Sequence, residues 1–355
     1  MKKWNRFLSL ALAGALALSL TACGGGNDDP SGGGNDPAGG GGDEQEVYEI
    51  IYAGTVTDTN PITIAFNQMA EQLEERSGGR LKMTLYPNNT LGDTRANIES
   101  MQNGTVQIGE GSIAPLAMFT DLYMPMSLPF LFSDWDEVWA FTESEFMQDI
   151  NDQVAEELGV RVIGWMSNGA RCLSNNVRAV STPADMAGLK IRVMENDIYQ
   201  ETFKALGANP ITMSFAELFT GLQQGTVNGQ DNATTITNAN RFYEVQSYFT
   251  DLHHVLDVAP IMVDDAWYQS LPDDLRQIFD ETLAENIEYE RQLTDEGVEA
   301  DMEAIATTCE ITLLTDEQRE AFREACAPVY DWFETQYPDL DLQVYLDAIE
   351  AASAG

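Results

Sequence analysis

The chain has 355 residues and carries 58 acidic against 18 basic side chains, which gives a formal net charge of −40. This charge argues against nucleic-acid binding and against direct docking on anionic lipid, because both need a surplus of Lys and Arg. Hydrophobic residues make up 44% of the chain, and only two histidines and four cysteines are present. The composition therefore predicts a folded protein that has few groups for nucleophilic or metal chemistry.

The N-terminus has the pattern of a secretory leader. Basic residues at positions 2, 3 and 6 precede an apolar stretch, 7–22, that is short for a membrane span. Its end, Leu20-Thr21-Ala22-Cys23, resembles a bacterial lipobox, in which the cysteine carries the lipids. We expect a signal peptide over 1–22 and lipidation of Cys23, so that the protein is extracytoplasmic and anchored to the cell membrane. An ordinary signal peptide with an incidental cysteine is the alternative.

The segment that follows is predicted to be a tether. Residues 24–46 contain ten glycines and almost nothing apolar, which is typical of a flexible linker. We therefore assign 23–46 to the lipidated cysteine and its tether.

From position 47 onward, short β-like segments alternate with amphipathic helical ones, which predicts an α/β fold with a mostly central sheet. Asn60 and Pro61 mark the start of the first helix, as cap and first helical residue. The predicted strands span 47–54, 81–86, 105–109, 160–166, 189–194, 209–213 and 227–232. The predicted helices among them span 61–77, 93–102, 134–157, 196–206 and 216–224, with another after 232.

The last part of the chain is predicted to be helical. Residues 272–307 form one run without an internal proline, and at 1.5 Å per residue such a helix would reach ~50 Å. This length suits a helix that bridges two lobes. Two further helices are expected over 316–336 and 341–352.

Catalytic and cofactor motifs are weak. Gly109-x-Gly111-x-x-Ala114 follows a strand and formally matches a dinucleotide fingerprint, but Pro115 shortens any helix after it. We interpret it as a tight turn that brings backbone to a ligand. His253 and His254 are adjacent, so we expect them on opposite faces of a strand with structural roles. With no metal-ligand spacing in the sequence, we predict no enzyme activity, no cofactor and no metal.

Basic residues are scarce, so those that lie in apolar segments are candidates for ligand binding or for internal ion pairs. Arg171 follows a predicted turn over 167–170, and Arg192 lies inside the apolar strand 189–194. A buried guanidinium must be paired, and its planar fork suits a carboxylate. For both arginines the alternative is an internal ion pair with one of the many acids. Asn232 stands at the start of a helix, where its amide could cap or bind.

The cysteine count leaves the disulfide question open. With Cys23 lipidated, Cys172, Cys309 and Cys326 remain, so at least one is unpaired within the chain. Cys309 and Cys326 could form a disulfide, or all three could be buried thiols, and the spacing does not decide between these.

A series of motifs between residues 48 and 352 resembles the solute-binding proteins of TRAP (tripartite ATP-independent periplasmic) transporters, of the dicarboxylate-binding (DctP) type. The order and spacing of the motifs carry the resemblance more than any single one. They are GGRLK at 78–82, YPNNTLGD at 86–93, LPFLF at 128–132, TPADMAGLKIRV at 182–193, ALGA at 205–208, LQQGTVNGQDN at 222–232 and FYEVQ at 242–246.

The resemblance implies a two-lobed, periplasmic-binding-protein-like fold (type II-like) with a long helix spanning both lobes and the ligand between them. It places lobe I near 47–168 plus 258–297, and lobe II near 169–257 plus 298–352. It also implies a monomeric receptor that captures a small organic acid and delivers it to the small and large membrane subunits of a permease. A receptor that signals to a membrane kinase is the alternative, and a secreted α/β hydrolase is a remote one.

Site residues follow from the same resemblance. The family's ligand-clamping arginine matches Arg192, its second arginine matches Arg171, and its asparagine matches Asn232. Asp231 stands where many members have Glu. The early histidines that are common near the first helix are absent, which leaves the lobe I contacts open.

The turn after the third strand is predicted to influence ligand choice. Glu110 replaces the basic or neutral residue often found there, and if it faces the cleft it would repel a second carboxylate and favour a hydroxylated or cationic distal end. Further candidates for ligand contact are Ser112, Met194, Met213, Phe215 and Trp267. Dicarboxylates, sugar acids, keto acids and amino-acid-like ligands all stay open at this point.

Overall fold

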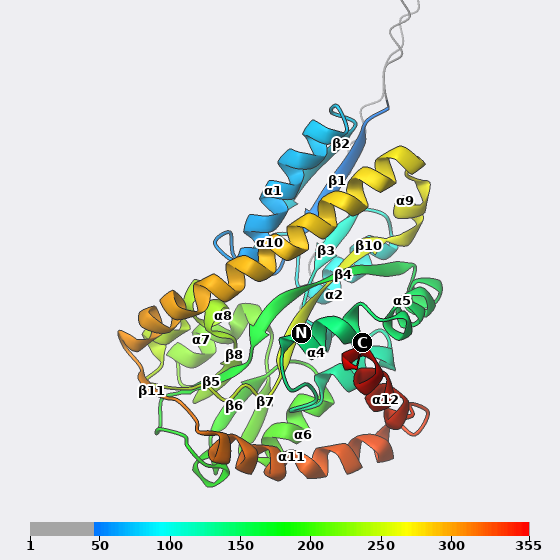
Figure 1. Cartoon of the computed structure of the whole chain (residues 1–355). Coiled ribbons are helices and arrows are strands. Elements are labelled where there is room, and N and C mark those ends of the chain that lie inside the picture. The colour runs from blue at the N-terminus through cyan, green and yellow to red at the C-terminus, as the bar shows by residue number, and fades with distance from the viewer. Residues whose placement is uncertain (1–45, 355) are drawn as a thin grey trace, which may run out of the picture. The chain divides into compact units, whose positions relative to one another are not determined.

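The structure is a computed structural model, and it describes residues 46–354 (Figure 1). The expected signal peptide, the lipid anchor at Cys23 and nearly all of the tether lie outside the described residues. Among the residues described, no helix combines the length and the apolar character that crossing a membrane requires.

One sheet has five strands and forms the centre of the first lobe. In spatial order the strands are β2 (Leu81–Tyr86), β1 (Tyr48–Ala53), β3 (Ile108–Glu110), β10 (Leu256–Asp264) and β4 (Val160–Ala170). β1 runs parallel to β2 and β3, whereas β10 is antiparallel to β3 and β4. The helices α1 (Pro61–Arg76), α2 (Thr94–Gln102) and α5 (Glu145–Leu158) accompany this sheet. β10 is buried along almost its whole length, as expected of a central strand covered on both faces.

The second sheet has six strands and forms the centre of the second lobe. Their spatial order is β11 (Glu310–Thr312), β9 (Tyr248–Thr250), β5 (Cys172–Asn175), β8 (Gly229–Asn232), β6 (Lys190–Val193) and β7 (Asn209–Thr212). β6 is parallel to both β7 and β8, and β5 is antiparallel to β8. The helices α6 (Asp197–Ala205), α7 (Leu218–Gln223) and α8 (Thr234–Ala239) belong with these strands.

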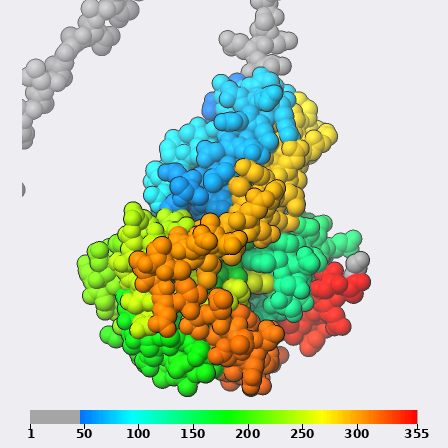
Figure 2. Space-filling view, turned by 60° about the vertical axis from the view of Figure 1, so that its left-hand side comes forward, coloured from blue at the N-terminus to red at the C-terminus, as the bar shows by residue number. Residues whose placement is uncertain are grey.

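The chain passes between the two sheets along strands and along one helix. β4 leads into β5 with only Arg171 between them, and 251–255 connect β9 to β10. The helix α10 (Asp273–Ala306) packs against α1 of the first lobe and α8 of the second. Figure 2 shows the yellow-to-orange band of α10 on the surface, running from the blue α1 region toward the green elements of the second lobe. The two-lobed α/β fold with a spanning helix is therefore confirmed.

The C-terminal helices depart from the expected division into lobes. α11 (Asp316–Gln336) begins beside the second lobe, but Val329 and Phe333 near its end join the apolar core of α4 (Trp135–Thr142) and α5. α12 (Leu342–Ser353) packs against α4. Residues 329–353 thus add to the first lobe, although 298–352 was assigned to lobe II. The amphipathic pattern of these helices identifies the buried face but not the lobe that covers it. The other boundaries remain a prediction.

Three local expectations differ from the structure. The helix expected over 134–157 is two helices, α4 and α5, because the Ser144 side chain accepts a hydrogen bond from the Met147 amide and starts a new helix there. The turn expected over 167–170 is the end of β4. His253 and His254 lie in the connection 251–255 and not in a strand.

The three cysteines in the described residues are all free and buried. Cys309 and Cys326 belong to different apolar clusters, so they do not form the disulfide that was left open. Burial raises the pKa of the Cys326 thiol to about 12, which leaves it unreactive at neutral pH.

Candidate functional site

A cavity of about 140 Å³ lies between the lobes. From the first lobe it is lined by Thr55, Val56, Asn89, Asp93, Thr94, Arg95, Glu110, Gly111, Ser112, Pro115 and Met118. From the crossing strand and the second lobe it is lined by Asn168, Arg171, Arg192, Met194, Glu195, Met213, Ser214, Phe215, Asn232 and Ile236. Eight of the nine predicted ligand-contact residues are therefore brought together at one cavity.

The loop after β3 forms the first-lobe wall. A Cβ atom on Gly111 would lie 2.4 Å from Cγ2 of Thr94, so only glycine allows the loop to pass this close to α2. Ser112 follows and precedes α3 (Ile113–Leu116). The expected tight turn is not present, because Gly109 lies in β3 and residues 111–112 are extended chain, but the segment does bring its backbone to the cavity.

Arg192 is the cation of the cavity whose charge has no paired acid. It lies on β6 and is 2% exposed. Its Nε donates a hydrogen bond to the Met213 carbonyl oxygen at 2.9 Å, while the buried Nη1 has no partner among the described residues. Burial lowers the pKa of Arg192 to about 10. A buried cation with unused donors is costly, and a ligand carboxylate would satisfy it.

Arg171 is buried as well, but its charge is matched inside the protein. Nε lies 2.7 Å from Oδ2 of Asp231, and Nη1 lies 2.8 Å from Oδ2 of Asp257. Nη2 donates to the Asp231 carbonyl oxygen at 2.5 Å. Burial alone would lower the pKa of Arg171, but the two aspartates raise it above its usual range. The internal ion pair, left open as the alternative for Arg171, is present.

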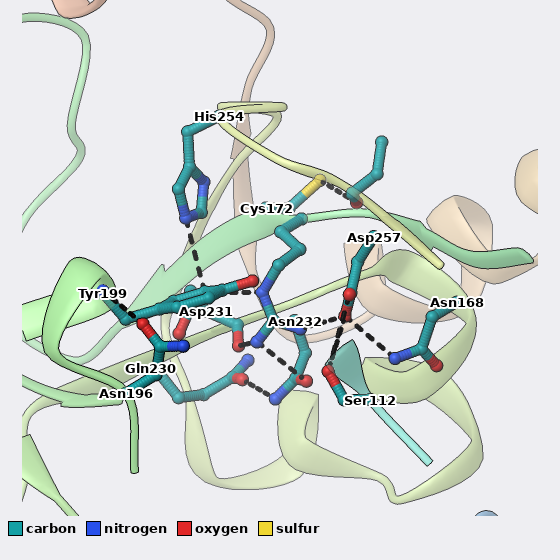
Figure 3. Close-up of polar contacts among 12 residues, drawn as sticks. Ser112, Asn168, Cys172, Asn196, Tyr199, Gln230, Asp231, Asn232, His254 and Asp257 are labelled. Atoms are coloured by element: carbon teal, nitrogen blue, oxygen red, sulfur yellow. Dashed lines mark hydrogen bonds and ion pairs between the residues drawn. The ribbon is translucent and has the colours of Figure 1, made fainter. Parts of the chain in front are cut away.

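Asp257 is a site residue that sequence reasoning missed. On β10, its Oδ2 accepts hydrogen bonds from Asn168 Nδ2 at 2.9 Å and from Ser112 Oγ at 3.3 Å, in addition to its ion pair with Arg171 (Figure 3). It therefore connects the first-lobe loop, the crossing strand β4 and the second lobe. Burial raises its pKa more than these partners lower it. Among 58 acids, nothing in its local sequence distinguishes it.

Asp231 and His254 complete the buried network behind Arg171. Burial would raise the pKa of Asp231, but Arg171 holds it below the usual range. Nε2 of the buried His254 lies 3.4 Å from Oδ2 of Asp231. His254 therefore belongs to the structure around Asp231.

Asn232 is fixed by its neighbours on β8 and in the network. Its Nδ2 donates to Oε1 of Gln230 at 2.5 Å, and its Oδ1 accepts from Nη2 of Arg171 at 3.3 Å. Gln230 in turn donates to Oγ of Ser174 at 2.9 Å. This chain of hydrogen bonds sets the orientation of the Asn232 amide at the cavity wall.

Glu110 brings a buried acid to the opposite wall. It is 1% exposed, and it accepts hydrogen bonds from the Thr55 amide at 2.5 Å and the Val56 amide at 3.3 Å. Thr55 Oγ1 lies 3.1 Å from each of its oxygens. Burial raises its pKa, although these donors oppose the shift. Glu110 does line the cavity, which was the condition for its expected effect on ligand choice.

Met194, Met213 and Phe215 form the apolar part of the wall, and the Phe215 ring lies 5.9 Å from the guanidinium carbon of Arg192. Trp267 does not line the cavity, so its assignment as a contact residue is corrected. It lies on α9 (Asp265–Ser270), and its ring packs edge-on against Phe279 of α10 at 5.7 Å. The polar residues Thr55, Asn89, Asp93, Arg95 and Glu195 were not predicted, although the motif at 86–93 contains two of them.

Within 46–354 no group of histidine, cysteine, aspartate and glutamate side chains is arranged to hold a metal ion.

Known proteins match this chain over most of its length. The model of the family described as bacterial extracellular solute-binding protein, family 7 (DctP) matches residues 52–336. The C4-dicarboxylate-binding periplasmic protein DctP of Vibrio cholerae is 33% identical over 303 residues, which cover 84% of this chain and 88% of that protein. The 2,3-diketo-L-gulonate-binding periplasmic protein YiaO of Escherichia coli is 29% identical, with 83% and 90% covered.

Solved structures show the same fold. The sugar acid binding protein DctPAm of Advenella mimigardefordensis, in complex with galactonate, superposes with a TM-score of 0.82 at 28% identity and covers 86% of this chain and 99% of its own. A TRAP periplasmic solute-binding protein of Shewanella oneidensis with bound succinate gives 0.80 at 28% identity, with 87% and 99% covered. The chain therefore belongs to family 7 of the bacterial extracellular solute-binding proteins, the solute-binding proteins of TRAP transporters.

Proposed function

We propose that this protein captures a small organic acid between its lobes and delivers it to the small and large membrane subunits of a TRAP permease. It acts by binding and not by catalysis, as a monomer held to the outer side of the cell membrane by a lipid on Cys23. Family membership supports the receptor role. The observation that carries the ligand assignment is the unpaired guanidinium of Arg192 in the cavity wall.

We expect Arg192 to bind a carboxylate through the terminal nitrogens of its guanidinium, of which Nη1 has no partner among the described residues. Its Nε is already held by the Met213 carbonyl oxygen, which orients the planar group, and the remaining donors match the two oxygens of a carboxylate. Closure of the lobes over the ligand would exclude water and strengthen this ion pair.

The remaining charges favour a ligand with one carboxylate. Arg171 is matched by two buried aspartates, and Arg95 at the rim pairs with Glu99 and is 59% exposed. A second ligand carboxylate would have no free cation to meet and would approach Glu110, whereas hydroxyl groups could donate to it. We therefore propose a hydroxylated monocarboxylate, the chemical class of the galactonate bound by one relative, in preference to a dicarboxylate such as the succinate bound by another.

Substitution of Arg192 tests the proposal. A thermal-shift screen with galactonate, glucuronate, succinate and malate identifies a binding acid, and calorimetry then gives its affinity. Arg192→Lys should weaken binding about tenfold or more, because the two-pronged geometry is lost, and Arg192→Ala should weaken it further.

The matched control is Arg241→Lys, because Arg241 is an exposed arginine of the second lobe that pairs with Glu244. Its variant should bind like the wild type. An Arg192→Ala protein that binds the acid with unchanged affinity would contradict the assignment.

A further inference from the structure

The helix α10 carries a buried carboxylate at the point where it crosses the strand β4. Glu290 is 0% exposed. Its Oε2 accepts a hydrogen bond from the Ser167 amide at 2.8 Å, and its Oε1 accepts one from Oγ1 of Thr294 at 2.6 Å. The next residue, Arg291, donates from Nη2 to the Trp165 carbonyl oxygen at 3.1 Å. Two consecutive side chains of the helix thus bind the backbone of β4.

This contact lies beside an irregularity in the strand pair that joins the lobes. Val258 of β10 pairs with Ser167, but Asp257 pairs with Gly169, so Asn168 is an extra residue in β4. Gly169 has a φ of +86°, which disfavours other residues. A bulge bends and twists a strand locally. The bend therefore begins directly after the residue that Glu290 holds.

The bend is connected to the ligand cavity. Asn168 lines the cavity and donates to Asp257, and Arg171 stands three residues further on in the buried ion-pair network. If the lobes rotate by bending of the chain between 168 and 171, the side chains of Asn168 and Arg171 move relative to the first-lobe wall of the cavity. Glu290 itself does not line the cavity.

Burying the Glu290 carboxylate costs free energy, which its hydrogen bonds must offset. A carboxylate removed from water costs several kcal/mol unless its oxygens are well bonded, and here the partners are one backbone amide of β4 and one hydroxyl of α10 itself. The bond to Ser167 is the only one of the two that joins the helix to the strand.

We propose that Glu290 is a positioning residue for lobe closure, which fixes Ser167 to α10 so that bending is confined to the segment 168–171. The inference rests on the proposed function, because closure is part of it. In the ligand-free protein the hydrogen bond between Glu290 and the Ser167 amide keeps the lobes in a narrow range of angles. Without this bond, the bending would extend along β4.

Distances between spin labels test this inference without any ligand. The exposed Glu71 of α1 and Gln223 of α7, replaced by cysteine, provide one label on each lobe, while the buried native thiols stay unlabelled. Wild-type protein should give a narrow distance distribution. Glu290→Ala should broaden it at least twofold, whereas Glu290→Gln should preserve it, because an amide oxygen still accepts from Ser167.

The control is Glu296→Ala, because Glu296 is an exposed glutamate on the same helix, and its distribution should equal that of the wild type. If Glu290→Ala does not fold, Glu290→Ser serves instead, since its short side chain cannot reach the strand. A folded Glu290→Ala or Glu290→Ser protein that keeps the wild-type distribution would overturn the inference. Rapid hydrogen exchange of the Ser167 amide in the wild-type protein would overturn it equally.

These measurements contain no organic acid. If the proposed ligand does not bind, the spin-label distances can still be interpreted. Conversely, the proposal for Glu290 can be wrong while the Arg192 variants bind as expected.

Discussion

Arg171 and Arg192 are both buried at the cavity wall, yet they hold their charge in different ways. The partners of Arg171 are Asp231 and Asp257, which lie 60 and 86 residues away in the chain. The partner of Arg192 is a carbonyl oxygen, and no acid is paired with it. The local sequence indicated that each arginine needed a partner. It did not indicate which of the two arginines is paired with an acid of the protein, because that pairing depends on where the fold places β8 and β10.

We expect Glu110 to influence the choice between ligands with one and two carboxylates, because it lines the cavity. Glu110→Gln removes the negative charge and keeps a hydrogen-bonding side chain of the same size. We expect this variant to improve succinate binding about tenfold, because a repulsive charge at close range costs on the order of 1 kcal/mol or more. Binding of galactonate should change much less. Calorimetry with both acids measures the ratio.

Glu75→Gln serves as the control, because Glu75 is an exposed acid of the same lobe outside the cavity. Wild-type protein that prefers succinate to galactonate, or a variant whose preference does not move, would show that Glu110 has no such influence.

At the scale of elements, the sequence predicts well where caps and periodic burial coincide. The strand over 81–86 and the helix over 316–336 have the predicted ends, and Thr315 starts that helix with a capping box. Asn60 caps α1, ahead of Pro61, as expected. The strands β5, β9 and β11, which have three or four residues each, were not predicted from the sequence. β10 is buried on both sides and so shows no alternation.

The helix α10 carries a titratable group whose effect on stability has a defined sign. Burial raises the pKa of Glu290 from 4.5 to about 7, against the opposing effects of Thr294, Ser167 and Arg291, while Asp295 adds to the shift. Between these two pH values the folded protein keeps a proton that the unfolded chain has released. The free energy of unfolding should therefore fall as pH rises through this window, by about 3 kcal/mol from this group, and level off above it.

Glu290→Gln removes this titration. The stability of the variant minus that of the wild type should rise from pH 5 to pH 8, as measured by chemical denaturation in matched buffers. The same difference for Glu296→Gln should stay flat, because Glu296 is exposed on that helix. A pH-independent difference for Glu290→Gln would mean that the buried carboxylate does not titrate in this range.

At the scale of the molecule, the net charge of −40 opposes the approach of an anionic ligand. This field is screened beyond about 8–10 Å at physiological ionic strength. The association rate of the acid should therefore increase several-fold when NaCl is raised from about 10 to 150 mM, because the repulsion weakens. Stopped-flow tryptophan fluorescence measures the rate.

The dissociation rate of the acid serves as the control. It depends on an ion pair inside a closed cavity, so it should change much less with salt than the association rate does. An association rate that falls with salt would show that the local charge of Arg192 outweighs the surface field.

The two-lobed architecture could be anticipated only through the resemblance to a family. The alternation of strands and helices indicates α/β layers, but not that β10 returns to the first sheet or that the last helices do so as well. Those returns join segments that are far apart in the chain, and no local pattern encodes them.

The position of β10 between β3 and β4 also sets an order for folding. The first sheet lacks an interior strand until residue 264 is available, and the edge strand β11 of the second sheet ends only at residue 312. A chain that emerges N-terminus first thus cannot complete either core early. Until most of it has been released, its apolar strands are exposed to aggregation.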